Sequence, residues 1–137
     1  MKEPSDARKR TLALQDRAIK FSVAVSKCCP TSRMDIPSNV VWGQLVRAAD
    51  SASNNLVEAD GASSDADFLH KLRIAMREAK ESRTCLRKIR LAGLANSGEV
   101  ERLNLEDEAD QLAAIFATIV MNMERRLASA KQRPKSS

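Results

Sequence analysis

Residues 68–89 read FLHKLRIAMREAKESRTCLRKI, and the spacing of the apolar positions in this stretch decides the fold class. Apolar or small residues recur at alternating intervals of four and three, a period of 3.5 residues sustained over nearly three heptads. Helices that pack in a left-handed bundle have this spacing. We therefore expect a helix over residues 64–92, ended by Gly93. Its buried seam is predicted to be Phe68, Leu72, Ala75, Ala79, Ser82, Leu86 and Ile89.

Three further segments with helical periodicity surround this one. They cover residues 7–29, residues 37–60 and a stretch that begins after Asn104 and keeps its apolar stripe to about Leu127. Four long helices with short connections predict an all-α fold, an antiparallel up-down-up-down four-helix bundle. We expect residues 1–127 to form this single domain and residues 128–137 to form a basic, flexible C-terminal tail. Outside the seam, the predicted core includes Leu112, Phe116 and Ile119.

The composition is that of a helical protein without a membrane span. Of 137 residues, 43% are hydrophobic and 3% aromatic, with only four Gly and four Pro, which argues against a β-sandwich or a barrel. No run approaches the ~18 uninterrupted apolar residues of a transmembrane helix. The polar N-terminal stretch lacks the apolar core of a signal peptide, so we expect a cytoplasmic protein with reduced cysteines.

The first predicted helix carries apolar residues on two faces. A helix at the surface of a monomeric bundle buries one apolar stripe, so a second apolar face indicates a contact with a partner subunit. This pattern predicts a homo-oligomer. The face expected to be buried has Leu14, Ala18, Phe21, Val25 and Cys28, and the second face has Leu12, Ile19 and Val23.

Residue patterns typical of catalysis or metal binding are missing from the sequence. His70 is the single histidine, and no nucleophile motif accompanies it. Cys28, Cys29 and Cys85 lack zinc-ligand spacing, and neither a glycine-rich phosphate loop nor the Glu-x-x-His pair of a di-iron bundle occurs. We therefore predict that the protein is not an enzyme and uses no metal or cofactor. His70 is expected to be exposed, and the cysteines are expected to be small core residues.

Positive charge gathers on the third predicted helix and at the C-terminus. The net charge is +5, from 23 Lys and Arg against 18 Asp and Glu. Six cations of the third helix fall on one broad face turned away from the apolar seam. Three interpretations are open: a solvated face, a stripe that binds phosphates, or a contact between subunits with the acidic residues 106–110. The candidate nucleic-acid-binding residues are Arg73, Arg77, Lys80, Arg83, Arg87 and Lys88, with Arg125 and Arg126 from a C-terminal cluster that continues to Lys131, Arg133 and Lys135.

A sequence motif spans the second and third predicted helices. Residues 44–59, QLVRAADSASNNLVEA, resemble the pattern Q-x-x-R-A-x-x-S-x-x-x-N-x-x-E-G, with Ala59 at the position of the Gly. Phe68, Leu72, Ile74-Ala75 and Glu81 resemble the F-x-x-x-L-x-I-A…E segment that follows. The chain thereby resembles the small bacterial four-helix-bundle family of 23S rRNA-intervening-sequence proteins. That family is related to the accessory variability proteins of diversity-generating retroelements.

The resemblance implies a homopentameric ring of bundles with a basic surface and a role in binding RNA or DNA. The retroelement relatives also bind a reverse transcriptase, and the family has no catalytic residues to carry over. Because aromatic residues are few, we expect binding to the nucleic-acid backbone without base stacking. The alternative is a protein–protein adaptor or a structural bundle whose basic surface binds acidic protein partners.

The motif also places four polar residues on one face of the second helix. Arg47, Ser51, Asn55 and Glu58 follow one another at intervals of four, four and three. Buried polar groups on one face can fix the register of a bundle or a contact between subunits. We predict a structural polar network of these four residues, with a ligand pocket as the alternative.

Overall fold

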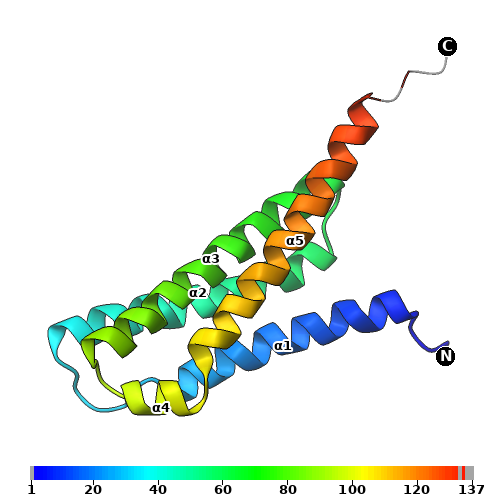
Figure 1. Ribbon diagram of the computed structural model, residues 1–137. Coiled ribbons are helices and arrows are strands. Elements are labelled where there is room, and N and C mark those ends of the chain that lie inside the picture. Colours follow the sequence, from blue (N-terminus) through cyan, green and yellow to red (C-terminus); the bar gives the residue numbers. More distant parts are fainter. Residues whose placement is uncertain (1, 133, 135–137) are drawn as a thin grey trace.

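The computed structural model describes residues 2–132 and 134, and this part of the chain contains five helices and no strand (Figure 1). Four helices are long, and none of the five, within the described residues, is both long and apolar enough to cross a membrane. The all-α prediction is confirmed. The helices are α1 (Asp6–Cys28), α2 (Ile36–Asp60), α3 (Asp65–Ala92), the short α4 (Ser97–Arg102) and α5 (Leu105–Gln132).

Local capping explains where the long helices begin and end. The side chains of Ser5, Asp35 and Ser64 each accept a hydrogen bond from a backbone N–H in the first turn of the helix that follows. Gly93 ends α3 with a φ of 60°, a left-handed conformation that glycine adopts without strain. The first three helices therefore keep the predicted bounds to within one residue.

The C-terminal helix is longer than its apolar stripe. The sequence predicted a tail from residue 128, whereas α5 continues through residues 128–132, all of which are exposed. Ala, Lys and Gln are good helix formers, so this end stays helical without packing against the core. Residues 133 and 135–137, including the predicted basic residues Arg133 and Lys135, lie outside the described residues.

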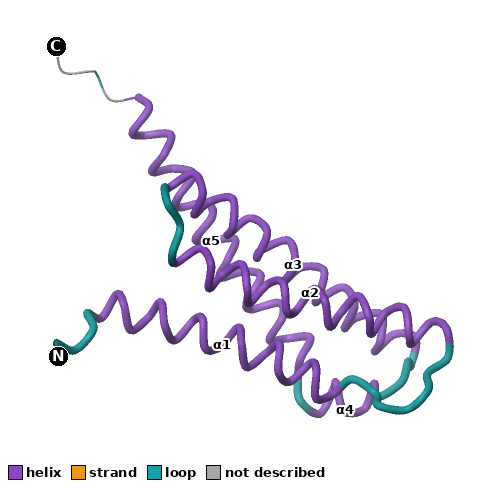
Figure 2. The backbone as a smooth tube through the Cα atoms, turned by 180° about the vertical axis from the view of Figure 1, so that it is seen from behind, coloured by secondary structure: helices purple, strands orange, loops and turns teal. Residues whose placement is uncertain are grey.

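α3 is the central helix of the fold. It packs along α2 on one side and along α5 on the other, while α1 packs mainly on α2. Successive long helices run in opposite directions, and α1 diverges from α5 toward the N-terminus (Figures 1 and 2). All four long helices therefore lie together near α4, and only α1 separates from α5 toward the opposite end (Figure 1).

The predicted seam of α3 forms the centre of the core, although a few residues expected to be buried are only half-buried, Leu14 of α1 among them. All of its members except Phe68 are buried, and Phe68, in the first turn of α3, is half-buried. Ile119 is also half-buried. Ile119 lies on the same face of α5 as Glu108, whose side chain contacts Arg17 of α1. It is three turns further along α5, where α1 has diverged and no longer covers this face. Leu112 and Phe116 are fully buried as predicted.

A buried tryptophan holds the connection between α3 and α4 in place. It was not among the predicted core residues. Trp42 is fully buried, and its indole N–H donates to the carbonyl of Ala95 at 2.9 Å. The hydroxyl of Ser38 accepts from the N–H of Ala95 at 3.1 Å, and the amide of Asn96 donates to the carbonyl of Cys28 at 2.8 Å. These three bonds hold the loop against the adjoining ends of α1 and α2.

Replacing Trp42 with phenylalanine is expected to lower the free energy of unfolding by about 1–3 kcal/mol. The change leaves the carbonyl of Ala95 without its donor and removes part of the buried ring volume. Urea unfolding followed by far-ultraviolet circular dichroism measures the decrease. Leu91→Ala, at a side chain that is 70% exposed, is the control and should stay within about 0.5 kcal/mol of the wild type. A Trp42→Phe protein as stable as this control would contradict the prediction.

Candidate nucleic-acid interface

The six predicted cations of α3 lie on its surface, as their spacing indicated. Five are exposed and Arg83 is half-buried. The six cations fall into two groups, because α5 packs along only one side of the α3 face that carries them. One group reaches carboxylates of α5, and the other lies on the outer ridge of α3.

Three of the six cations bind carboxylates of α5 in the same chain. The sequence left open a contact between the basic helix and the acidic helix of different subunits. In the structure α3 and α5 pack side by side, and these pairs form within one chain. They are Arg73 Nη2 to Glu124 Oε1 at 3.3 Å, Arg83 Nη1 to Asp110 Oδ1 at 2.8 Å and Arg87 Nε to Glu106 Oε1 at 3.5 Å.

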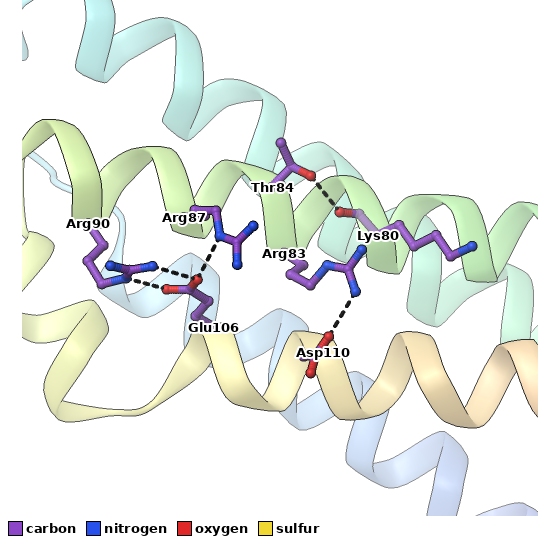
Figure 3. A network of polar contacts seen from close by, with 7 residues as sticks. All are labelled: Lys80, Arg83, Thr84, Arg87, Arg90, Glu106 and Asp110. Atoms are coloured by element: carbon purple, nitrogen blue, oxygen red, sulfur yellow. Dashed lines mark hydrogen bonds and ion pairs between the residues drawn. The ribbon is translucent and has the colours of Figure 1, made fainter.

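Glu106 is the centre of the strongest of these contacts (Figure 3). It accepts two hydrogen bonds from Arg90, at 2.7 and 3.1 Å, besides the longer contact with Arg87. The hydrogen bonds from Arg90 lower the pKa of Glu106, and the positive charges of Arg90 and Arg87 add to the effect. The sequence analysis did not select Arg90, because its role depends on an acidic partner sixteen residues away.

A cleft of about 680 Å³ lies where these groups meet, between α3, α4 and α5. Its walls carry three arginines and four carboxylates, so the cleft has no excess of positive charge. A phosphate that entered it would have to replace a carboxylate at a guanidinium. The lining charges are Arg83, Arg87, Arg90, Glu101, Glu106, Asp107 and Asp110.

The outer ridge of α3 carries the cations that are free to meet a partner. Arg77, Lys80 and Lys88 are exposed, and none has a carboxylate of the described residues within 4.0 Å. They extend over about 16 Å of the helix axis. Thr84 lies between them on the same ridge, with its hydroxyl donating to the carbonyl of Lys80 at 3.1 Å. We call Arg77, Lys80 and Lys88 the open ridge.

The two predicted C-terminal cations are separate from this ridge. Arg125 and Arg126 are exposed near the end of α5 and line a shallow hollow with Asp65. That hollow is at the end of the fold opposite to α4 (Figure 1). Arg125 and Arg126 therefore lie apart from the cations at the α4 end of α3, whereas Arg73 reaches Glu124, which directly precedes Arg125, at 3.3 Å.

Of the predicted four-residue polar network, only the contact between Ser51 and Asn55 forms within the described residues. The amide of Asn55 donates to the carbonyl of Ser51 at 2.9 Å and to its hydroxyl at 3.2 Å, which is a local bond within α2. Arg47 and Glu58 are exposed, and no side-chain hydrogen bond joins either to this pair within the described residues. Eleven residues of helix place these two about 16 Å apart along the axis, too far to meet.

A carboxylate pair that the sequence analysis missed lies on the α2 side of α3. Glu78 and Glu81 are both half-buried. Burial raises the pKa of Glu78, and the negative charge of Glu81 raises it further, while Arg47 and Arg77 oppose the shift. Spacing alone did not reveal this pair, because its effect depends on how closely α2 covers this face of α3.

The residues considered for chemistry are one histidine and three cysteines. His70 is exposed at the start of α3, as predicted. Cys28 and Cys85 are buried, Cys29 is half-buried, and all three are free thiols. Burial raises the pKa of each thiol, which lowers its reactivity as a nucleophile. Within the described residues, no cluster of three or more His, Cys, Asp or Glu side chains has the arrangement to hold a metal ion.

Comparison with known sequences and structures identifies the family to which this helical protein is similar. The family model of the 23S rRNA-intervening sequence proteins matches residues 10–118. The chain belongs to this family. A crystal structure of a protein of unknown function from the S23 ribosomal protein family of Bacteroides thetaiotaomicron is similar in fold, with a TM-score of 0.63 at 24% identity over 78% of this chain and 97% of that chain. No curated protein matches the sequence.

For this member of the 23S rRNA-intervening sequence family, the bounds of the match separate the two basic sites. The open ridge, the arginines of the cleft and the polar face of α2 all lie inside residues 10–118. Arg125 and Arg126 lie beyond the matched region. The residues of the ridge and the cleft therefore lie within the matched region, and the C-terminal cations lie outside it.

Glu78→Gln is expected to stabilise the protein at neutral pH by up to about 1 kcal/mol. A raised pKa means that the folded protein holds a proton where the unfolded chain has released it. The carboxyl of Glu78 therefore favours folding at low pH, and this contribution is lost as the pH rises through its folded-state pKa. The advantage of the variant should disappear below the ordinary glutamate pKa of 4.5.

Urea unfolding across a pH series tests this expectation. Glu58→Gln, at an exposed carboxylate of α2, is the matched control and should change stability little at any pH. A difference between Glu78→Gln and the wild type that stays constant from acid to neutral pH would contradict the assignment.

Proposed function

We propose that this protein is a non-catalytic helical protein that binds the phosphate backbone of RNA or DNA through the open ridge of α3. The observation that carries the proposal is the exposure of Arg77, Lys80 and Lys88 without carboxylate partners among the described residues. The net charge of +5 supports it, because long-range attraction brings a polyanion to such a surface.

The positions of the aromatic residues favour contact with the backbone over contact with bases. Single-strand binders stack bases on exposed aromatic rings. Here Phe21, Trp42 and Phe116 are buried and Phe68 is half-buried, and they are all the aromatic residues of the chain. Binding should therefore depend strongly on salt and weakly on sequence.

Replacing Arg77, Lys80 and Lys88 together with glutamine is expected to weaken binding to double-stranded DNA and to flatten its salt dependence. Removing one cation that neutralises a phosphate lowers the slope of log affinity against log salt by about one, so the slope of the triple variant should fall by roughly two to three. Fluorescence anisotropy with one duplex DNA and one duplex RNA of equal length measures both effects.

The matched control removes one arginine and two lysines from a different helix. Arg10, Lys20 and Lys27 are exposed on α1, and their replacement with glutamine gives the same net charge. This control should keep most of the wild-type slope. No binding by the wild type near about 50 mM salt, or equal decreases in both triple variants, would contradict the proposed ridge.

The proposal includes self-association of an up-down-up-down four-helix bundle into a ring. Leu12, Ile19 and Val23 form an apolar face of α1 that is 40%, 44% and 46% exposed. Burying this face against a second copy would remove it from water, and a ring would repeat the ridge around its circumference. Five copies are what the resemblance implies, and a pentamer is the assembly we propose.

Light scattering after size exclusion is expected to give a mass well above the 15.1 kDa of one chain, near five times that value. Changing Leu12, Ile19 and Val23 to serine should reduce the mass while helix content is kept. Ile36 and Leu91, exposed at 81% and 70%, provide a control double serine variant that should still assemble. A wild-type mass near 15.1 kDa at micromolar concentration would rule out the ring.

A second candidate function is an adaptor that binds acidic proteins. It is favoured by the carboxylates that Arg73, Arg83 and Arg87 already bind, because an acidic partner would present the same group. A reverse transcriptase stays a predicted partner on the resemblance alone. Failure to bind either nucleic acid at low salt, together with a normal assembly, would favour the adaptor.

A further inference from the structure

The cleft between α3 and α5 contains three arginines, and each of them binds a carboxylate of α5. Arg83 binds Asp110, and Arg87 and Arg90 bind Glu106 (Figure 3). A guanidinium offers the same paired N–H groups to a carboxylate and to a phosphate. The acidic side chains of α5 therefore hold the places that phosphate oxygens would take.

The contacts are unequal, so they would not break together. Arg90 binds Glu106 through two atoms, at 2.7 and 3.1 Å. The contact of Arg87 with Glu106 is longer, at 3.5 Å, and the Arg87 side chain is 64% exposed. The Asp110 side chain is 60% exposed. Exposed ion pairs are weak and salt-sensitive, so Arg87 and Arg83 are the two that a phosphate can capture.

These two arginines lie beside the open ridge, on the side of α3 that faces α5. Lys80, Arg83 and Arg87 follow one another along α3, with Lys80 and Arg83 on neighbouring turns (Figure 3). Arg83 and Arg87 are one turn apart, about 6 Å along the axis. A backbone that lies on the ridge therefore reaches the mouth of the cleft without leaving α3.

We propose that the α3–α5 cleft is a masked phosphodiester site, in which Glu106 and Asp110 compete with nucleic-acid phosphates for Arg83 and Arg87. This inference rests on the proposed function of the ridge and adds its regulation. Binding exchanges the carboxylates for phosphates, so the wild-type protein binds more weakly, and neutralises fewer phosphates, than its number of cations allows. Because phosphates must displace these carboxylates, binding of nucleic acid at the cleft depends on how many phosphates lie close to the two arginines.

Replacing Glu106 with glutamine and Asp110 with asparagine tests the mask with little change of shape. We expect affinity for duplex DNA to rise at least about tenfold at a given salt concentration, and the salt slope to steepen by roughly one to two. The matched control is Glu99→Gln with Asp16→Asn, which removes two carboxylates from the pairs with Arg102 and Lys20. It makes the same change in net charge outside the cleft.

Two further variants test whether the gain in affinity depends on Arg83 and Arg87. In the Glu106→Gln, Asp110→Asn background, changing Arg83 and Arg87 to glutamine should cancel the increase. The single change Asp110→Asn, at an exposed carboxylate, is the version to use if loss of Glu106 impairs folding, and it should give a smaller gain of the same kind.

The outcomes separate this inference from the proposed function. Suppose that the wild type binds DNA and that the affinity of the cleft variant rises no more than that of the control variant. The masked site is then overturned, and the proposal that the ridge binds DNA is kept. Binding by the cleft variant alone supports the mask and overturns binding by the ridge in the unmodified protein. If neither protein binds duplex DNA or RNA at low salt, both proposals are overturned.

Discussion

Leu72, Leu86 and Ile89 are buried between the neighbouring helices of the fold, and their burial sets the orientation of α3. A helix has one rotational setting in which its apolar seam faces inward, and every other side chain then points in a known direction. On α3 this setting turns Arg83 and Arg90 toward α5 and Glu78 toward α2, and it leaves Arg77 on the outer ridge. The charge pattern of the surface follows from the core.

The electrostatic character of this protein depends on which cations α5 can reach. The net charge is positive, but part of the α3 face is neutralised by carboxylates of the same chain, and only the ridge farthest from α5 keeps its charge free. The number of basic residues therefore overstates the positive electrostatic potential that a nucleic acid would encounter at this surface. Three free cations make a modest site, so repetition of the chain in an assembly would matter for affinity.

α1 is held differently from the other long helices. The burial of Phe21 and Val25 attaches its C-terminal half, whereas polar contacts secure the rest: Arg8 with Asp60, and Arg17 with Glu108. The hydrogen bonds from Arg8 lower the pKa of Asp60. Exposed ion pairs of this kind contribute only about 0–1 kcal/mol each. The apolar outer face of α1 is thus carried by a helix that packs mainly on α2 and has few contacts with α5.

The sequence by itself determined the long helices, the ends of the first three and most of the inward seam of α3. These features depend on residues within a few positions of one another, such as the cap at Ser64, Gly93 after the last turn, and the alternation of three and four. The exposure of the second face of α1 and of His70 followed from the same periodicity. Even so, periodicity did not show that Ile119 is only half-buried, because that depends on how far α1 diverges from α5.

Only the tertiary structure decided which charges neutralise one another. Arg83 and Asp110 are 27 positions apart, and Arg73 and Glu124 are 51 positions apart. Their pairing depends on the side and register at which α5 meets α3, which no local pattern encodes. The same holds for Trp42, whose partner Ala95 is 53 residues away. Local spacing specifies what a helix offers on each face, and packing between helices decides which of those groups are left for a partner.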